Sequence, residues 1–388
     1  MLFLALVASA AAVSLSCAEE KEPVGPASVG PAPGQMRPVP PSRYEVPTDG
    51  VRVTTSAQLR SALSRSQPTD IVLADGEYDG SRPFLNEHGH RVYAANLGGA
   101  VLRAGLSLGG NAGRPGGLVR GLVFDVRDAE KTVEGAEIAV WGTGKGSRVL
   151  DVTLLGNRVI RTGLVVRQPE GFRGARLVAR GFTDYGVVVD ANDPALDRLA
   201  RPFRLTDAAV AGVARAVPRS SNGTAEACIW IGNPGVVRRV QVRRCAWTGL
   251  WTGTSATGAL FDRIDVDQTP TGVYVEHFTR RSTFQRLRVG DEVRVGLVAE
   301  WAAPEWGGRP ASIDNVIQDS RFESSVAGVY LDDGTTRTTV RRSTFVNQRW
   351  AAIGNYRGID NAFYGNDYGA VASGADHVTD EHLSSFRE

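Results

Sequence analysis

Gly186-Val187-Val188-Val189 is one copy of a motif that recurs along the chain, in which a small residue precedes three residues of mostly aliphatic, β-branched or aromatic character. Neighbouring copies are separated by 23, 42, 21, 23, 24, 32 and 24 residues, so five of the seven steps lie between 21 and 24. A nearly constant period of this size is typical of repeat architectures. The other copies begin at Gly163, Cys228, Gly249, Gly272, Gly296, Gly328 and, more weakly, Ala352.

A second short strand is predicted between most consecutive copies, with apolar alternation such as Ile264/Val266. Strands of about four residues cannot bury a face alone and must stack on the next copy, which predicts a parallel β-solenoid. A propeller blade needs a period of about 40 residues or more and does not fit. These second strands are Ala175 to Ala179, Arg239 to Arg243, Arg263 to Asp267, Arg286 to Val289, Asn315 to Asp319 and Thr338 to Arg342.

The opening of the repeat region adds a recognisable pattern. Ser56 to Ser64 predicts a short amphipathic helix, and Pro68-Thr69-Asp70, an aliphatic strand and Gly76-Glu77-Tyr78 follow it. With coils of about 23 residues, this resembles the right-handed parallel β-helix of the pectate-lyase-like superfamily, whose members often begin with a capping helix, Pro-Gly-Asp, a strand and Gly-x-Tyr. Thr69 stands in place of that glycine.

The resemblance covers roughly residues 50 to 375 and implies an all-β, right-handed parallel β-helix with a short N-terminal capping helix. An open solenoid needs such a cap because its first coil would otherwise expose core and strand edges. The architecture hosts lyases, hydrolases, esterases, epimerases and non-catalytic adhesins, so the chemistry must come from the site.

The N-terminal region predicts export. Residues 1–17 begin with an apolar run about as long as the hydrophobic part of a signal peptide, and the run is too short to span a bilayer. Leu15-Ser16-Cys17 resembles the end of a bacterial lipoprotein signal, and cleavage after Ala10-Ala11-Ala12 is the alternative. Residues 18–49 form a proline-rich linker and residues 50–388 the β-helix domain. We expect a secreted, periplasmic or cell-surface protein, with membrane contact only through a lipid on Cys17.

The charge balance limits the kinds of binding partner, and the cysteine content limits the possible disulfides. The chain has 44 Lys+Arg against 42 Asp+Glu, a net charge of +2, which supplies no broad basic surface for nucleic acid. Beyond Cys17 there are two cysteines, Cys228 and Cys245. An exported protein permits a disulfide between them, but two buried thiols are the preferred expectation.

The motif also predicts columns of side chains. With the small residue numbered zero, positions one and three face the core while positions two and four face solvent. Neighbouring coils lie about 4.8 Å apart, so each position becomes a row along the solenoid. Position two gives Val188, Trp230, Trp251, Tyr274, Val298 and Tyr330. Position four gives Asp190, Gly232, Gly253, Glu276, Glu300, Asp332 and Tyr356.

Aromatic rings in a row can stack on sugar rings, so the position-two column predicts a glycan-binding surface. The alternative is that an inserted loop covers the rings and makes them part of a core. The predicted substrate-binding residues are Trp230, Trp251, Tyr274, Tyr330, Trp301, Arg280 and Arg357.

Carboxylates in register repel one another unless a metal, a shared proton or an arginine compensates. Side chains one or two coils apart would be about 5 or about 10 Å apart, near the separations of retaining and inverting glycosidases. The alternative is a solvated face neutralised by arginines, and His277, as a lone histidine, is more often structural. The predicted catalytic residues are Glu276, Glu300, Asp332, Asp333 and His277.

Three functions are compatible with these features. The preferred one is an exported enzyme that hydrolyses glycosidic bonds of a polysaccharide or oligosaccharide with two of these carboxylates and no cofactor. The second is a polysaccharide lyase in which the stacked carboxylates hold Ca²⁺ against an acidic sugar and His277, Arg280, Tyr356 or Arg357 removes the C5 proton. The third is a non-catalytic surface protein that binds glycans.

Overall fold

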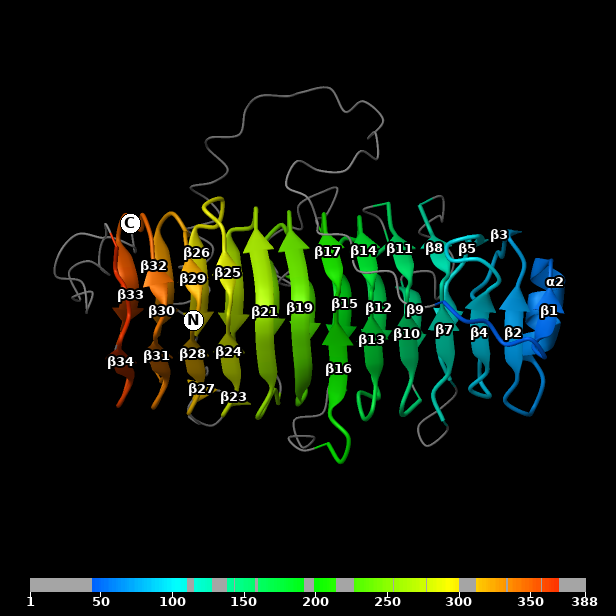
Figure 1. Ribbon diagram of the computed structural model, residues 1–388, viewed down its shortest axis with the longest axis horizontal. Helices are drawn as coiled ribbons and strands as arrows, with labels where there is room; N and C mark the ends of the chain where they lie inside the picture. Colours follow the sequence, from blue (N-terminus) through cyan, green and yellow to red (C-terminus); the bar gives the residue numbers. More distant parts are fainter. Residues whose placement is uncertain are drawn as a thin grey trace, which may run out of the picture.

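A computed structural model describes residues 44–109, 115–127, 138–142, 144–157, 160–191, 199–213, 227–253, 255–276, 278–299, 312–332, 334–356 and 358–369. Within these ranges the chain is an all-β, right-handed parallel β-helix whose coils follow one another along the long axis of the molecule (Figure 1). The strand pairs within the described ranges are parallel, as in Tyr185–Val189 on Ala227–Ile231. The predicted fold class is confirmed.

Ten strands, one from each successive coil, form the sheet that carries the repeat motif, and we call it the motif sheet. Their order in the sheet follows the chain, because each coil returns to the same face one step further on. The strands are β6 (Leu106–Ser107), β9 (Ile138–Gly142), β12 (Thr162–Val166), β15 (Tyr185–Val189), β18 (Ala227–Ile231), β20 (Thr248–Thr252), β22 (Thr271–Val275), β26 (Val295–Ala299), β30 (Ala327–Leu331) and β33 (Ala351–Asn355).

The remaining two sides of the solenoid form one bent sheet of 22 strands. It bends where one residue per coil adopts a positive φ, for example Asp151 (57°), Arg176 (53°) and Asp207 (56°). The strands are β1 (Val51–Val53), β2 (Asp70–Leu73), β3 (Gly76–Tyr78), β4 (Arg91–Ala94), β5 (Ala100–Leu102), β7 (Leu118–Arg120), β8 (Val123–Asp125), β10 (Arg148–Leu150), β11 (Thr153–Leu155), β13 (Arg173–Ala175), β14 (Val178–Arg180), β16 (Phe203–Thr206), β17 (Ala209–Ala211), β19 (Gly235–Arg243), β21 (Leu260–Asp267), β24 (Thr283–Gln285), β25 (Arg288–Val289), β28 (Val316–Gln318), β29 (Arg321–Phe322), β31 (Thr339–Arg341), β32 (Thr344–Phe345) and β34 (Ala362–Tyr364). A separate pair consists of β23 (Thr279–Arg280) and β27 (Ser312–Ile313).

The core runs through the middle of the solenoid and contains the residues at positions one and three, such as Ile229 and Ile231, both fully buried. Position zero also faces inward, and this explains its small residues. A Cβ on Gly163 would lie 2.6 Å from the carbonyl oxygen of Gly186 in the next coil, and one on Gly249 would lie 2.7 Å from that of Gly272. Larger side chains would push neighbouring coils apart.

Helix α2 (Ser56–Leu63) covers the first coil, as predicted. Its N-cap is Thr55, whose hydroxyl accepts a hydrogen bond of 3.2 Å from the amide of Gln58. Leu59 and Leu63 are buried against the coil. The helix therefore covers the open end of the core.

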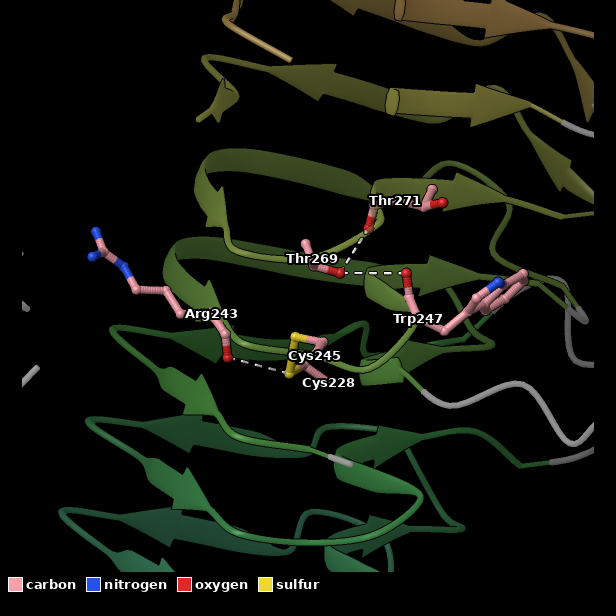
Figure 2. The surroundings of a disulfide bond; sticks show 6 residues. All are labelled: Cys228, Arg243, Cys245, Trp247, Thr269 and Thr271. Atoms are coloured by element: carbon pink, nitrogen blue, oxygen red, sulfur yellow. Dashed lines mark hydrogen bonds between the residues drawn. A yellow bond between two sulfur atoms is a disulfide. The ribbon is translucent and has the colours of Figure 1, made fainter. Parts of the chain in front are cut away.

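Cys228 and Cys245 form a disulfide, so the expectation of two buried thiols is wrong. Cys228 stands at position zero of β18 and points inward, and the chain brings Cys245 around the same coil to a Cα–Cα separation of 5.6 Å (Figure 2). That separation suits a disulfide. The bond connects the strand of Trp230 to the turn that carries Trp247.

Tyr44, near the end of the predicted linker, packs on the outside of the solenoid. Its hydroxyl donates a hydrogen bond of 2.6 Å to the carbonyl of Ala94, and the guanidinium of Arg120 lies 5.0 Å from its ring centroid. Burial raises the pKa of Tyr44 to about 12. The described part of the chain has no helix with the length and hydropathy needed to cross a bilayer. The predicted signal, Cys17 and most of the predicted linker lie outside the described residues.

Candidate functional site

The outer face of the motif sheet carries the predicted columns. Strand pairing places Val188, Trp230, Trp251, Tyr274, Val298 and Tyr330 in register on consecutive strands. The position-two column is therefore confirmed. Residues at position four follow each strand directly, so their column runs beside it.

Six rings from this face form an aromatic cluster that is separate from the solenoid core, namely Tyr185, Trp230, Trp247, Trp251, Tyr274 and Tyr330. The ring centroids of Trp230 and Trp251 are 4.5 Å apart, and those of Trp251 and Tyr274 are 5.1 Å apart. Trp247 packs 5.2 Å from both Trp251 and Tyr274, and Tyr185 lies 5.9 Å from Trp230. Such tilted and edge-to-face contacts hold the rings in fixed orientations.

The aromatic column is less open than an exposed row. Trp251 is 7 % exposed and Tyr274 is 6 % exposed, whereas Trp230 and Tyr330 are partly exposed. The expectation that all position-two rings face solvent is therefore wrong for Trp251 and Tyr274. Trp247 packs against both of these rings. Trp230 and Tyr330 are the cluster's partly exposed position-two rings.

Two carboxylates of the position-four column are each held by a tryptophan. The indole Nε1 of Trp251 donates a hydrogen bond of 2.9 Å to Oε2 of Glu276, and the indole Nε1 of Trp230 donates one of 3.1 Å to Oδ2 of Asp190. Asp190 is 4 % exposed and Glu276 is partly buried. Fixed donors of this kind orient a carboxylate.

The two carboxylates lean toward one another across two coils that carry glycine at position four. Their Cα atoms are three coils apart, or about 14 Å. A Cβ on Gly232 would collide with the carboxylate of Asp190, and a Cβ on Gly253 would lie 2.5 Å from Oε2 of Glu276. Because these glycines are on adjacent coils, the carboxylate oxygens are no more than about 10 Å apart. That limit includes the separations found in retaining and inverting glycosidases.

The pKa of Glu276 is raised from 4.5 to about 7. Burial is the main cause, the hydrogen bond from Trp251 acts in the opposite direction, and the negative charge of Asp190 raises the pKa further. Glu276 is therefore substantially protonated near neutral pH, with Asp190 as an acidic neighbour. Two carboxyl groups with different protonation are the arrangement that acid–base chemistry requires.

A cavity of about 260 Å³ lies beside Asp190, over β9, β12, β15 and β18. Arg167 occupies position four of β12, immediately before Asp190 in the column, and its Nη1 donates a hydrogen bond of 3.2 Å to the carbonyl oxygen of Asp190. Arg161 pairs with Asp184 at 2.7 Å. The cavity is lined by Arg161, Thr162, Arg167, Tyr185, Asp190 and Trp230, together with Ile138, Val165 and Val188.

The structure separates the predicted catalytic residues. Glu276 and Asp332 follow β22 and β30, two strands apart in the motif sheet, and Asp332 is 4 % exposed. Glu276 leans toward Gly253, which is on the side of Asp190 and away from Asp332. Three other predicted catalytic residues, His277, Glu300 and Asp333, lie outside the described residues.

The predicted binding residues are also separated. Trp230, Trp251 and Tyr274 meet in the aromatic cluster, while Tyr330 also packs with Ala351 further along the sheet. Arg280 belongs to β23, and its guanidinium lies 5.7 Å from the ring centroid of Phe278. Trp301 and Arg357 lie outside the described residues.

Sequence reasoning missed three residues of this face. Asp190 was placed in the position-four column but given no role, because the nearest predicted acid stood three copies away. Arg167 occupies the same position of the Gly163 copy, so extending the column by one coil would have found it. Trp247 lies one residue before β20, at a position to which the repeat numbering assigns no role.

A scan against known protein families gives no match, and no curated protein matches the sequence. Solved structures of similar shape include an alginate lyase from Paenibacillus sp. FPU-7, with 12 % identity over 82 % of this chain and 99 % of the other and a TM-score of 0.39. The A-module of the mannuronan C-5 epimerase AlgE6 from Azotobacter vinelandii has 11 % identity over 84 % of this chain and 97 % of the other, with a TM-score of 0.42.

A GH87 α-1,3-glucanase from Streptomyces thermodiastaticus has 12 % identity over 86 % of this chain and 71 % of its own, with a TM-score of 0.42. The chain is a right-handed parallel β-helix protein. At these TM-scores the comparisons carry no argument about chemistry. The chemistry therefore depends on the residues of the site.

Proposed function

We propose that this protein is an exported enzyme that hydrolyses glycosidic bonds, with Glu276 as general acid and Asp190 as its partner carboxylate. The observation that supports it most is the pair itself: Glu276, with its pKa raised to about 7, and Asp190 lean together over two glycines. Cleavage of a glycosidic bond needs one protonated and one ionised carboxyl group. Export, as predicted from residues 1–17, suits an enzyme that acts on extracellular polysaccharide.

In this mechanism Glu276 transfers its proton to the glycosidic oxygen as the bond between that oxygen and the anomeric carbon breaks. Asp190 either attacks the anomeric carbon or takes a proton from the water that attacks it. A separation of about 5 Å would favour the first route, and one of about 6.5 to 9.5 Å the second. Neither route requires a cofactor.

The tryptophans have separate roles in this proposal. Trp230 is partly exposed beside Asp190, so its ring can contact a sugar while its N–H holds the carboxylate. Trp251 is nearly buried and acts on Glu276 through its hydrogen bond. Both carboxylates are thereby fixed before substrate binds, which reduces the reorganisation needed in the transition state.

The test is turnover of a panel of polysaccharides by the wild type and by Glu276→Gln and Asp190→Asn. Each substitution should lower kcat by a factor of about 10² to 10⁴ with the circular dichroism spectrum unchanged. Asp314→Asn is the control, because Asp314 pairs with Arg337 in a separate part of the solenoid. Unchanged turnover in Glu276→Gln would remove this residue from the mechanism. Binding of a glycan with no product from the wild type would instead favour a non-catalytic binding protein.

Arg161 and Arg167 favour a second candidate, a polysaccharide lyase, because a lyase acts on acidic sugars. Arg167 would then be the candidate for the base that removes the C5 proton. Calcium fits poorly on the two carboxylates, since each already accepts an indole N–H donor, and the described residues contain no group of three metal-ligating side chains. A product with a new double bond, seen as ultraviolet absorbance, would favour the lyase over the hydrolase.

A further inference from the structure

Three arginines form a row on the outer face of the bent sheet. Strand pairing places Arg148 of β10 opposite Arg173 of β13, and Arg173 opposite Arg204 of β16. All three residues are exposed. Neighbouring coils lie about 4.8 Å apart, so these side chains place three positive charges on three consecutive coils. We call them the arginine row.

The charge of the arginine row is not balanced by acids. Like charges directly opposite one another on paired strands are destabilising. Elsewhere on the bent sheet such charges are paired, as at Asp151, which accepts hydrogen bonds of 3.1 Å from Arg120 and 3.0 Å from Arg176. Within the residues that the structure describes, no carboxylate forms an ion pair with an arginine of the row. An anionic partner would relieve this repulsion.

The surface beside the arginine row is open to such a partner. Two residues further along the same strands lie Leu150, Ala175 and Thr206, which are in register, half-buried and uncharged. Glu170, in the turn before β13, already pairs with Lys145 at 2.7 Å. A broad anionic surface can therefore approach the three guanidinium groups together.

The chain enters the domain next to the arginine row. The hydroxyl of Tyr44 donates a hydrogen bond to the carbonyl of Ala94 on β4, and its ring packs on Arg120 of β7, the strand that pairs with β10. Gly121 leaves room for this ring, because a Cβ there would collide with it. Figure 1 shows the first described residues crossing β7 and β4 on their way to β1. Cys17, which is predicted to carry a lipid, is therefore joined to the domain on this face.

We infer that the outer face of β10, β13 and β16 docks on an anionic lipid bilayer, whose phosphates are bound by Arg148, Arg173 and Arg204. Guanidinium groups donate paired hydrogen bonds to phosphate oxygens. The entry of the predicted tether beside the row favours a bilayer over a soluble polyanion. The motif sheet is a separate sheet of the solenoid, so docking leaves its outer face accessible. The inference does not depend on the proposed hydrolysis.

Docking is measured by cosedimentation of the full chain with vesicles. The chain carries Cys17→Ala, so that no lipid on the protein contributes. The vesicles consist of phosphatidylcholine alone or of phosphatidylcholine with one third phosphatidylglycerol, at low and at high salt. We expect binding to the anionic vesicles to be tenfold or more tighter than to the neutral ones at low salt, and high salt to remove the difference.

The triple variant Arg148→Gln/Arg173→Gln/Arg204→Gln removes the charge of the arginine row. It should bind the anionic vesicles at least tenfold more weakly and the neutral vesicles as the wild type does, because each arginine near an anionic bilayer contributes to binding. Its melting temperature should not fall, since the substitutions remove like charges in register. A loss of binding is then separate from a loss of folding.

The matched control makes the same change of charge at three exposed arginines of the bent sheet outside the row, Arg263→Gln/Arg288→Gln/Arg321→Gln. It should keep most of the binding to anionic vesicles. Equal binding by the wild type and the row variant, equal losses in the row variant and the control, or binding that high salt leaves unchanged would each overturn the inference. Retention of the wild type by heparin without binding to anionic vesicles would also overturn it, in favour of a soluble polyanion.

Discussion

The indole N–H of Trp251 and Oε2 of Glu276, on neighbouring coils, are joined by a hydrogen bond of 2.9 Å. This contact acts against the burial that raises the pKa of Glu276 to about 7. A donor stabilises the ionised carboxylate, so it lowers the pKa that burial alone would give. The tryptophan therefore sets the pH range over which the proposed acid keeps its proton.

Replacing Trp251 by Phe should raise the pKa of Glu276 above its present value, because the donor is lost while the ring remains. If Glu276 is the general acid, the alkaline limb of the pH profile of kcat/KM should move to higher pH. Trp247→Phe is the matched control, since Trp247 packs against the same ring without being a cause of the shift in Glu276. Coincident profiles for Trp251→Phe and the wild type would contradict this assignment.

The pKa of Glu276 also predicts how stability depends on pH. Its folded value, about 7, is above its ordinary value of 4.5, so the folded state binds more protons than the unfolded state between these values. The free energy of unfolding should fall as pH rises from about 4.5 to about 7, by up to about 3 kcal/mol from this group. Glu276→Gln lacks this contribution. Its free energy of unfolding, measured by urea denaturation, should therefore rise relative to that of the wild type as the pH is raised from 5 to 8.

The stability contribution of Asp207 should depend on pH in the opposite direction from that of Glu276. Its pKa is lowered, chiefly by the hydrogen bond from Arg239, so its contribution to stability is present at neutral pH and is lost on acidification. The free energy of unfolding of Asp207→Asn should therefore be lower than that of the wild type at pH 7, and this difference should become smaller at low pH. A gain for Asp207→Asn at pH 7, or a constant difference between Glu276→Gln and the wild type, would contradict the charge states described here.

Alanine at Gly253 should disturb the acid without disturbing the fold. A Cβ there would lie 2.5 Å from Oε2 of Glu276, and the flexible carboxylate would have to move. Turnover should fall by at least tenfold while the melting temperature changes little. Gly142→Ala is the control in the same sheet, because its Cβ would meet its nearest neighbour at an ordinary 3.4 Å. Full activity in Gly253→Ala would show that the orientation of Glu276 is unimportant.

The disulfide between Cys228 and Cys245 should contribute to stability. It closes a short loop, with 17 residues of separation, and such bonds stabilise by about 3 kcal/mol. Cys228→Ala/Cys245→Ala should lower the free energy of unfolding by about this amount, and reductant should not affect the double variant. An unchanged denaturation midpoint would show that packing alone holds this coil together.

The repeat made the architecture predictable. Small residues recur at position zero because a side chain there would meet the carbonyl oxygen of the next coil, and this close contact imposes the period on the sequence. Core positions such as Ile229 and Ile231 followed from alternation. The cysteine pairing did not, because two cysteines carry no sign of whether the coil brings their Cα atoms within bonding range.

The site was predictable as a set of columns and not as a set of contacts. The register placed Glu276 and Asp190 in one column, but alternation gives only the face on which a side chain lies and not its tilt along the solenoid. Glycines at 232 and 253 provide the space into which the two acids lean. Alternation predicted that Trp251 and Tyr274 face solvent. It did not predict that Trp247 packs against them, because that contact depends on the turn before β20.

The two glycine coils between Asp190 and Glu276 act as a spacer of fixed pitch. Because a solenoid grows by whole coils, the number of coils between these two acids can change only in steps of about 4.8 Å. Loss of one 21- to 24-residue repeat would press the acids together, and gain of one would separate them beyond a single sugar unit. Duplication or deletion of repeats would thus change the separation of the two acids in discrete steps, while point substitutions adjust it only within each step.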